Sequence, residues 1–183
     1  MKIIVITGVS NGIGLDTAKY FLQKGHTVFG ISRSKTKLTE SENTFTGSFH
    51  YIKADICNEN ELISAVQIIK SKTNTVDILI NNAGILINKP FTQLTKNDFT
   101  QLYNTNIIAA ATLIQQLLPL MLDKVARTHI INIGSMGGFQ GSSKFVGLSA
   151  YSSSKAALVS LSECLAEELK NKQIGRASCR ERV

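Results

Sequence analysis

The stretch TGVSNGIG, residues 7–14, decides the fold of this chain. It follows the short β-branched run 3–6 and precedes apolar residues at helical spacing, so it joins a strand to a helix. Gly8 permits a sharp turn, Gly12 lets backbone N–H groups approach a phosphate, and Gly14 lets the helix pack close to a sheet. A glycine loop at the start of a helix is typical of pyrophosphate binding, because unpaired N–H groups and the positive end of the helix dipole meet there. A plain turn is the alternative for the glycines taken alone.

Outward from this loop, strand and helix patterns alternate. The fourth apolar run, 76–80, is apolar except for Asp77, as expected of a strand buried on both faces. Alternating strands and helices with buried strands predict a parallel sheet covered by helices, in a single domain. We expect strands at 3–6, 27–31, 49–54, 76–80 and 130–133, and helices at about 13–24, 59–71, 97–122 (bent or ended by Pro119) and 151–171.

The composition of the chain excludes several classes of protein. With 183 residues, 43% of them hydrophobic, the chain can bury a core. No apolar run reaches the roughly 18 residues of a membrane span, and the apolar run after Lys2 is too short for a signal peptide, so a strand is expected there. The net charge of +7 is dispersed, without the basic and aromatic clusters of a nucleic-acid interface. Three scattered cysteines indicate reduced thiols in a cytoplasm, and no metal-ligand spacing is present, so we expect no metal site.

Tyr151 and Lys155 form a Y-x-x-x-K pair whose side chains share one face of a helix. A free phenol titrates near ~10, and a nearby ammonium favours the phenolate. Tyrosine then becomes a usable general acid in reduction and general base in oxidation. Ser135, after the fifth strand, can donate a hydrogen bond to an oxygen on which charge develops. The alternative is that all three are ordinary helix and loop residues, because Y-x-x-x-K is common by chance.

The glycine stretch has the form T-G-x-x-x-G-I-G, Asp55 follows the third strand, NNAG (81–84) follows the fourth, and Asn106 lies in YNTNI. Together with Ser135 and the Y-x-x-x-K pair, these motifs in this order resemble the short-chain dehydrogenase/reductase family. The resemblance covers residues 2 to about 172. It implies a Rossmann-like doubly wound parallel sheet in three layers, α/β/α. It also implies an NAD(P)-dependent oxidoreductase that interconverts a carbonyl and an alcohol by hydride transfer.

The resemblance implies specific site residues. Tyr151 is the acid and base, Lys155 also binds the nicotinamide ribose, and Asn106 holds a water in a proton relay behind the lysine. The implied catalytic residues are Asn106, Ser135, Tyr151 and Lys155. The implied cofactor-binding residues are Gly8, Ser10, Asn11, Gly12, Ile13, Gly14, Ser32, Arg33, Asp55, Ile56, Asn82, Ala83, Gly84, Tyr151 and Lys155.

The end of the second strand indicates which cofactor is preferred. An acid there would hydrogen-bond the adenosine ribose and favour NAD. This chain has Ser32 and Arg33 instead, and a small residue followed by arginine suits a 2′-phosphate. The sequence therefore favours NADP(H) over NAD(H), with a solvent-facing arginine as the alternative.

Two regions depart from the family pattern. Tyr151 lies sixteen positions after Ser135, and the stretch between them includes SSKFVG (142–147), which predicts a longer loop beside the substrate pocket. The family pattern continues after the last helix with a Pro-Gly turn, a sixth strand, a substrate lid and a seventh strand. This chain instead reads IGRASCRERV (174–183), which resembles one reading frame of a sequencing-library adapter; a genuine basic tail is the alternative.

We therefore expect an incomplete domain at 1–173 that lacks the last strands, and a non-native tail at 174–183. The fifth strand would then be an open apolar edge, and the chain would aggregate and have little activity. Two other readings are a non-catalytic nucleotide-binding protein of the same fold and an inactive fragment. The expected partner is a small carbonyl or alcohol, with a 3-oxoacyl thioester, a sugar, a steroid and a small aldehyde all open. No nucleic-acid or membrane partner is expected, and the full-length form is expected to be a homodimer or homotetramer.

Overall fold

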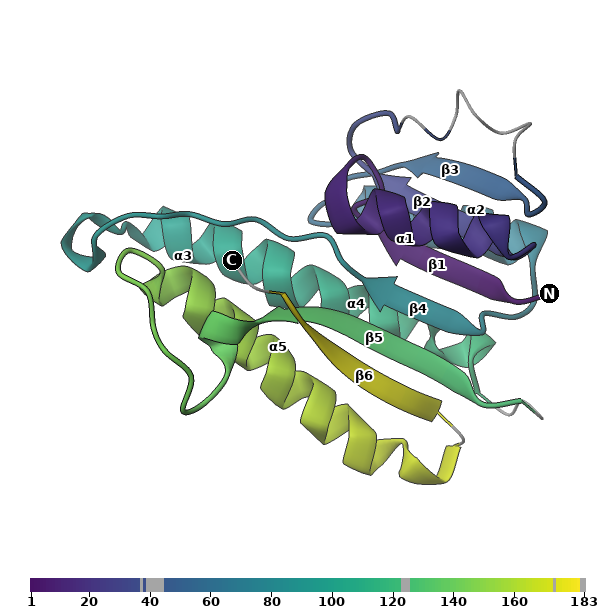
Figure 1. Ribbon diagram of the computed structural model, residues 1–183. Coiled ribbons are helices and arrows are strands. Elements are labelled where there is room, and N and C mark those ends of the chain that lie inside the picture. Colours follow the sequence, from purple (N-terminus) through teal and green to yellow (C-terminus); the bar gives the residue numbers. More distant parts are fainter. Residues whose placement is uncertain (37, 39–44, 123–125, 173, 182–183) are drawn as a thin grey trace.

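The computed structural model describes residues 1–36, 38, 45–122, 126–172 and 174–181. Its centre is a six-stranded sheet with every neighbouring pair parallel, in the order β3-β2-β1-β4-β5-β6 (Figure 1). The chain starts in the middle of the sheet and builds outward on both sides, so the strand order reverses between β1 and β4. The strands are β1 (Ile3–Thr7), β2 (Thr27–Ser32), β3 (Phe49–Lys53), β4 (Ile78–Asn81), β5 (Thr128–Ser135) and β6 (Ile174–Glu181).

Helices cover both faces of the sheet. Ile4 and Ile6 pack against α1 on one face, whereas Val5 points the other way and packs in the cluster that includes α2 and α4. The predicted doubly wound, three-layer α/β/α fold is confirmed. Among the described residues, no helix has the length and apolar character needed to cross a membrane. The main helices are α1 (Gly12–Gln23), α2 (Glu59–Lys72), α3 (Lys96–Tyr103), α4 (Ala109–Leu117) and α5 (Ser149–Glu168), with short turns η3 (Phe91–Gln93), η5 (Leu118–Leu120), η6 (Met136–Gly138) and η7 (Lys170–Lys172).

The long helical run predicted over 97–122, with its end near Pro119, is present, but it is not one regular α-helix. A π-helical segment, η4 (Asn104–Ile108), separates α3 from α4, and the single turn η5 with Pro119 ends the run. A π turn takes in an extra residue and rotates the side chains around it. Apolar spacing on either side of it is still helical, so the sequence pattern alone does not reveal the interruption.

The prediction that β5 is an open edge is also wrong. β6 pairs with β5 over its whole length, from Thr128 opposite Ile174 to Ser135 opposite Glu181. A parallel ladder uses backbone N–H and C=O groups, so an apolar edge strand pairs with an extended segment whatever its side-chain pattern. Ile174 is buried and joins the core beside Ile130. The non-native origin of 174–183 stays a prediction from its sequence.

A short chain of buried amides ties β4 and β5 to α5. Asn81 lies opposite Asn132 in the β4–β5 register and donates to its Oδ1 at 2.9 Å. Asn132 then donates to Ser162 Oγ at 2.8 Å. Because buried polar groups require such partners, a shift in the strand register would leave them unpaired. The network therefore specifies the register of the strands that lead into the candidate site.

Removing residues 174–183 tests the role of β6. A chain that ends at residue 173 exposes the backbone edge of β5, and we expect it to self-associate or aggregate because an unpaired apolar edge templates further pairing. Size-exclusion chromatography with light scattering measures this. A chain that ends at residue 181 is the control and should behave like the parent. A monodisperse 173-residue chain with the parent's Tm would contradict the stabilising role of β6.

Candidate active site

A cleft of about 450 Å³ opens at the carboxyl ends of the strands, where the strand order reverses. This is the edge at which open α/β sheets bind ligands. We call it the switch-point cleft. Twelve of the residues predicted from the sequence line it: Gly8, Ser10, Asn11, Gly12, Ile13, Ser32, Arg33, Asp55, Ile56, Asn82, Ala83 and Gly84. The sequence prediction missed Ile31, Ser34, Ala54, Cys57, Ile85 and Thr105.

The glycine loop forms the floor of the cleft. Gly8 and Gly12 have positive φ angles of 76° and 56°, which side-chain-bearing residues rarely adopt. Gly14 lies behind the lining, where an added Cβ would collide with the carbonyl oxygen of Gly8. At Gly12 an added Cβ would meet no described atom within 4 Å, so this part of the backbone faces open space. Among the described contacts, the Asn11 side chain does not cap α1, and Gly12 and Ile13 of its first turn line the cleft.

The segment after β4 is held against the end of β1. Asn82 Nδ2 donates to the carbonyls of Thr7 and Gly8 at 3.0 and 3.1 Å. The backbone N–H of Ala83 donates to Thr7 Oγ1 at 3.0 Å. These bonds cross the point of strand reversal and set the shape of the cleft there.

One rim of the cleft carries charge. The Arg33 guanidinium lies 4.0 Å from Asp55 Oδ2, and its side chain is 69% exposed, so it is within reach of a ligand in the cleft. Asp55 Oδ1 accepts a hydrogen bond from the backbone of Cys57 at 2.9 Å. The Cys57 thiol lies 3.2 Å from Thr105 Oγ1, and its burial raises the pKa of the thiol. Within the described parts of the chain, no three His, Cys, Asp or Glu side chains gather as a metal site would require.

Four buried polar residues lie beside the cleft, and we call them the buried tetrad: Asn106, Ser135, Tyr151 and Lys155. Lys155 Nζ lies 6.0 Å from the centre of the Tyr151 ring and donates to the Ile133 carbonyl at 2.7 Å. An added Cβ at Gly84 would lie 3.1 Å from Asn106 Oδ1 and 3.4 Å from Lys155 Nζ. Since Gly84 also lines the cleft, the tetrad and the cleft meet at this glycine.

Ser135 faces α5 across a pair of glycines. Its Oγ accepts from the Gly137 N–H at 3.3 Å. An added Cβ at Gly137 would lie 2.7 Å from Ser152 Oγ, and one at Gly138 would lie 2.8 Å from the Ala156 nitrogen. Both glycines therefore allow the end of β5 to approach the helix that carries Tyr151.

Asn106 fixes the backbone of Ile85. Its Oδ1 accepts from the Ile85 N–H at 2.9 Å, and its Nδ2 donates to the Ile85 carbonyl and to Ser154 Oγ, both at 3.0 Å. The side-chain amide is thus engaged with protein groups. The proton-relay role implied by the family resemblance stays a prediction.

The loop between Ser135 and α5 is tied down by Lys144. Its ammonium donates to the carbonyls of Gly137 and Phe139 at 2.9 and 2.6 Å. The Ser142 hydroxyl donates to the Phe139 carbonyl at 2.7 Å. The predicted longer loop therefore folds back on itself, while Phe145 and Val146 at its tip are exposed.

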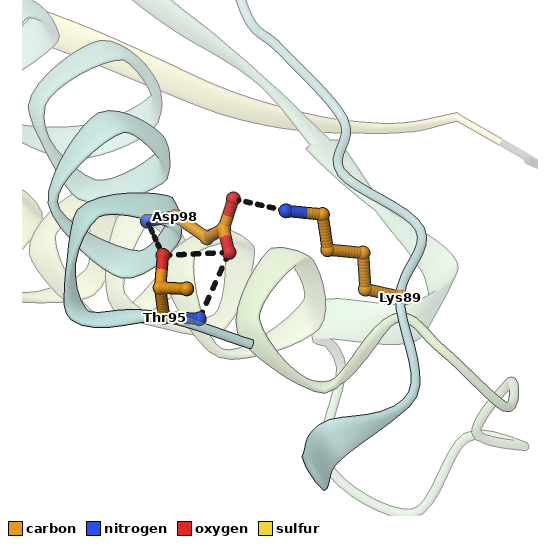
Figure 2. Close-up of polar contacts among 3 residues, drawn as sticks. All are labelled: Lys89, Thr95 and Asp98. Atoms are coloured by element: carbon orange, nitrogen blue, oxygen red, sulfur yellow. Dashed lines mark hydrogen bonds and ion pairs between the residues drawn. The ribbon is translucent and has the colours of Figure 1, made fainter. Parts of the chain in front are cut away.

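An ion pair that sequence reasoning missed lies between the segment after β4 and α3 (Figure 2). Lys89 Nζ donates to Asp98 Oδ1 at 2.8 Å. This hydrogen bond, with those from the backbone and hydroxyl of Thr95, lowers the pKa of Asp98 to about 2. Thr95 and Asp98 form a capping box at the start of α3. The T-x-x-D spacing was the signal that could have located the carboxylate.

Residues 2–179 match the family model described as short chain dehydrogenase. The 3-ketodihydrosphingosine reductase of Bacteroides thetaiotaomicron is 37% identical over 168 residues. The ketoacyl reductase HetN of a Nostoc species is 33% identical over 171 residues. Each alignment covers 92% of this chain and 58% of the relative, so the chain spans less than two thirds of the length of these relatives.

Solved structures are similar in three dimensions. The RhlG/NADP active-site complex of Pseudomonas aeruginosa is 30% identical with a TM-score of 0.84, covering 94% of this chain and 69% of that one. A short chain dehydrogenase/reductase of Burkholderia phymatum in complex with NAD is 23% identical with a TM-score of 0.89, covering 99% and 65%. At 23% identity, the similarity to the Burkholderia phymatum structure shows a shared fold only.

Asp98 predicts a pH-dependent contribution to stability. Its pKa is depressed from 3.8, so its contribution is complete above pH 3.8 and is lost as the pH falls through about 2. The Tm difference between the parent and Asp98→Asn should therefore be largest above pH 4 (about the unfolded-state pKa) and shrink toward pH 2. Thermal unfolding across this range measures it.

The matched control is Asp16→Asn, because Asp16 forms an exposed ion pair with Lys19 at 3.7 Å. Such surface pairs contribute little to stability, so its Tm should follow the parent's throughout. A Tm difference for Asp98→Asn that stays constant down to pH 2 would contradict the assignment.

Proposed function

Because the chain belongs to the short chain dehydrogenase family, we propose that it is an NADP(H)-dependent oxidoreductase that interconverts a carbonyl and an alcohol. The observation that carries the proposal is the junction at Gly84. There the switch-point cleft adjoins Asn106 and Lys155, and Lys155 lies beside Tyr151 on the same face of α5. A dinucleotide-sized cleft next to a buried phenol and ammonium suits the transfer of a hydride and a proton to one substrate.

The residues of the cleft fit a dinucleotide. The backbone around Gly12 and the first turn of α1 would hold the pyrophosphate, because both offer N–H groups toward open space. Asp55 would contact the adenine end, and Arg33 would pair with a 2′-phosphate. RhlG, which is 30% identical, was solved with NADP, which supports the preference for NADP(H).

Tyr151 carries the proton in the proposed reaction. When bound, the nicotinamide supplies or accepts the hydride. Tyr151 gives a proton to the substrate oxygen in reduction and removes it in oxidation. The Lys155 ammonium favours the phenolate form electrostatically, and Ser135 donates a hydrogen bond to the substrate oxygen. Burial of all three strengthens these interactions, because the interior has a low dielectric constant.

The proposal includes the cellular compartment in which the protein acts. Cys57 and Cys164 are free thiols in the structure, which suits a reducing cytoplasm. We place the protein there, acting on a small carbonyl or alcohol. Assembly into a homodimer or homotetramer stays a prediction from the family resemblance.

Arg33→Ala tests the cofactor preference. Loss of a charged hydrogen bond to the 2′-phosphate should weaken NADP(H) binding by about 1–3 kcal/mol, or roughly 5- to 150-fold, and leave NAD(H) binding nearly unchanged. Fluorescence titration with NADPH and NADH measures both Kd values without turnover. Lys24→Ala, which removes an exposed cation at the far end of α1, is the matched control. Equal losses for both cofactors would show that Arg33 does not bind the phosphate.

Tyr151→Phe tests proton transfer. The variant keeps the ring and removes the proposed acid, so kcat should fall about 10²- to 10⁴-fold while the Kd of NADPH is retained. Tyr20→Phe, on the exposed side of α1, is the control. A Tyr151→Phe variant with more than about a tenth of the parent's kcat would exclude Tyr151 as the acid. A parent that binds NADPH but turns over no carbonyl would favour the non-catalytic alternative.

A further inference from the structure

Lys89 is in contact with two other segments of the chain. Its ammonium donates to Asp98 at the start of α3 (Figure 2), and its backbone N–H donates to the Gly147 carbonyl at 3.0 Å. Gly147 lies two residues before α5, the helix that carries Tyr151. An added Cβ at Gly147 would collide with the Asn88 side chain, so the two segments pack without a gap. Lys89 is therefore the point at which the segment after β4, α3 and the loop before α5 meet.

The extended segment 82–90 is anchored at three places along its length. Asn82 is bonded to the end of β1, Ile85 is held on both backbone groups by Asn106, and Lys89 is held by Asp98 and Gly147. The first two anchors lie next to the switch-point cleft. Lys89 provides the third anchor, at the far end of segment 82–90. No residue at that end takes part directly in the proposed mechanism.

The apolar cluster that contains Tyr151 packs against this segment. Leu102, Leu148 and Ala150 are its other buried members. Ile85 and Ile87 pack against the same cluster from the segment, and Leu94 and Phe99 pack against it from the start of α3. The elements that surround Tyr151 are thus the same three that Lys89 connects.

The ion pair differs from an ordinary surface pair. Exposed pairs contribute little, because both side chains give up conformational freedom in a high dielectric. The Asp98 side chain is only 10% exposed, and it also accepts from the backbone and the hydroxyl of Thr95. The orientation of the Asp98 carboxylate is therefore set by Thr95 as well as by Lys89. Removal of Lys89 would leave this carboxylate without its cation in a largely buried place.

We propose that the Lys89–Asp98 ion pair is a positioning element for Tyr151, which holds segment 82–90 and α3 together around the phenol. Its catalytic consequence rests on the proposed function. Lys89 and Asp98 are positioning residues, since they act through Ile85, Ile87 and Phe99 and take no part in the chemistry. Displacement of a reacting group by about 1 Å can cost on the order of 10²-fold in rate.

Lys89→Met tests the proposal, because it keeps the aliphatic stem and removes the cation. We expect kcat for carbonyl reduction to fall about 10- to 100-fold, with the Kd of NADPH within about twofold of the parent's because the cleft contacts are retained. Lys89→Arg restores the cation and should recover most of kcat. Lys170→Met, which removes the exposed Lys170–Glu167 pair near the other end of α5, is the matched control and should keep the parent's kcat.

A double-mutant cycle with Asp98→Asn shows whether the two residues act as a pair. Asp98→Asn keeps an oxygen for the Thr95 cap and loses the charge, so it should fold even where Lys89→Met is unstable. If the pair is the acting unit, Lys89→Met adds little to the loss of kcat in the Asp98→Asn background. Full additivity of the two losses, or an unchanged kcat in both single variants, would overturn the proposal.

Amide hydrogen exchange measures the coupling between Lys89 and the segments around Tyr151 without requiring turnover. Peptides that cover 84–90 and 145–151 should exchange faster in Lys89→Met and at the parent's rate in Lys170→Met. Equal exchange in Lys89→Met and the parent overturns the proposal whether or not the chain reduces a carbonyl. Faster exchange in Lys89→Met than in the parent, where the parent itself lacks reductase activity, supports the positioning contact and rejects only the proposed function.

Discussion

The hydrogen bonds from Asn82 to the carbonyls of Thr7 and Gly8 join the segment after β4 to the end of β1. The rest of the structure depends on this junction. Strand order reverses between β1 and β4, so their following loops run to opposite sides and leave a gap at the carboxyl ends. Asn82 crosses that gap and supplies donors to backbone groups at the end of β1. The cleft exists because the loops after β1 and β4 diverge, and the Asn82 amide holds the start of the second loop against the end of β1.

From Asn82 onward, segment 82–90 forms a wall between two environments. On one side Ala83, Gly84 and Ile85 line a polar cleft that is open to solvent. On the other side Ile85 and Ile87 pack against the apolar cluster around Tyr151. A dinucleotide requires the first environment, and a phenol that moves a proton benefits from the second. Ile85 takes part in both, so the cleft and the cluster adjoin at this residue.

The buried tetrad is assembled from three separate parts of the chain. Asn106 comes from the π-helical segment, Ser135 from the end of β5, and Tyr151 and Lys155 from α5. Small residues permit the approach at each junction, above all Gly84 and Gly138. Because Asn106 and Lys155 are held by hydrogen bonds to backbone groups of other segments, the arrangement depends on the fold as a whole.

The sequence by itself determined the features that depend on local patterns. Apolar runs located five strands, the glycine spacing located the turn before α1, and the residues predicted around Gly8, Ser32, Asp55 and Asn82 line one cleft. Only the tertiary structure decided the π turn at 104–108, the pairing of β6 with β5, and the ion pair of Lys89 with Asp98. It also placed Cys57 and Thr105 in the cleft. The reason is physical: propensity and periodicity act between near neighbours in the chain, whereas strand pairing and side-chain ion pairs depend on where the fold places each partner.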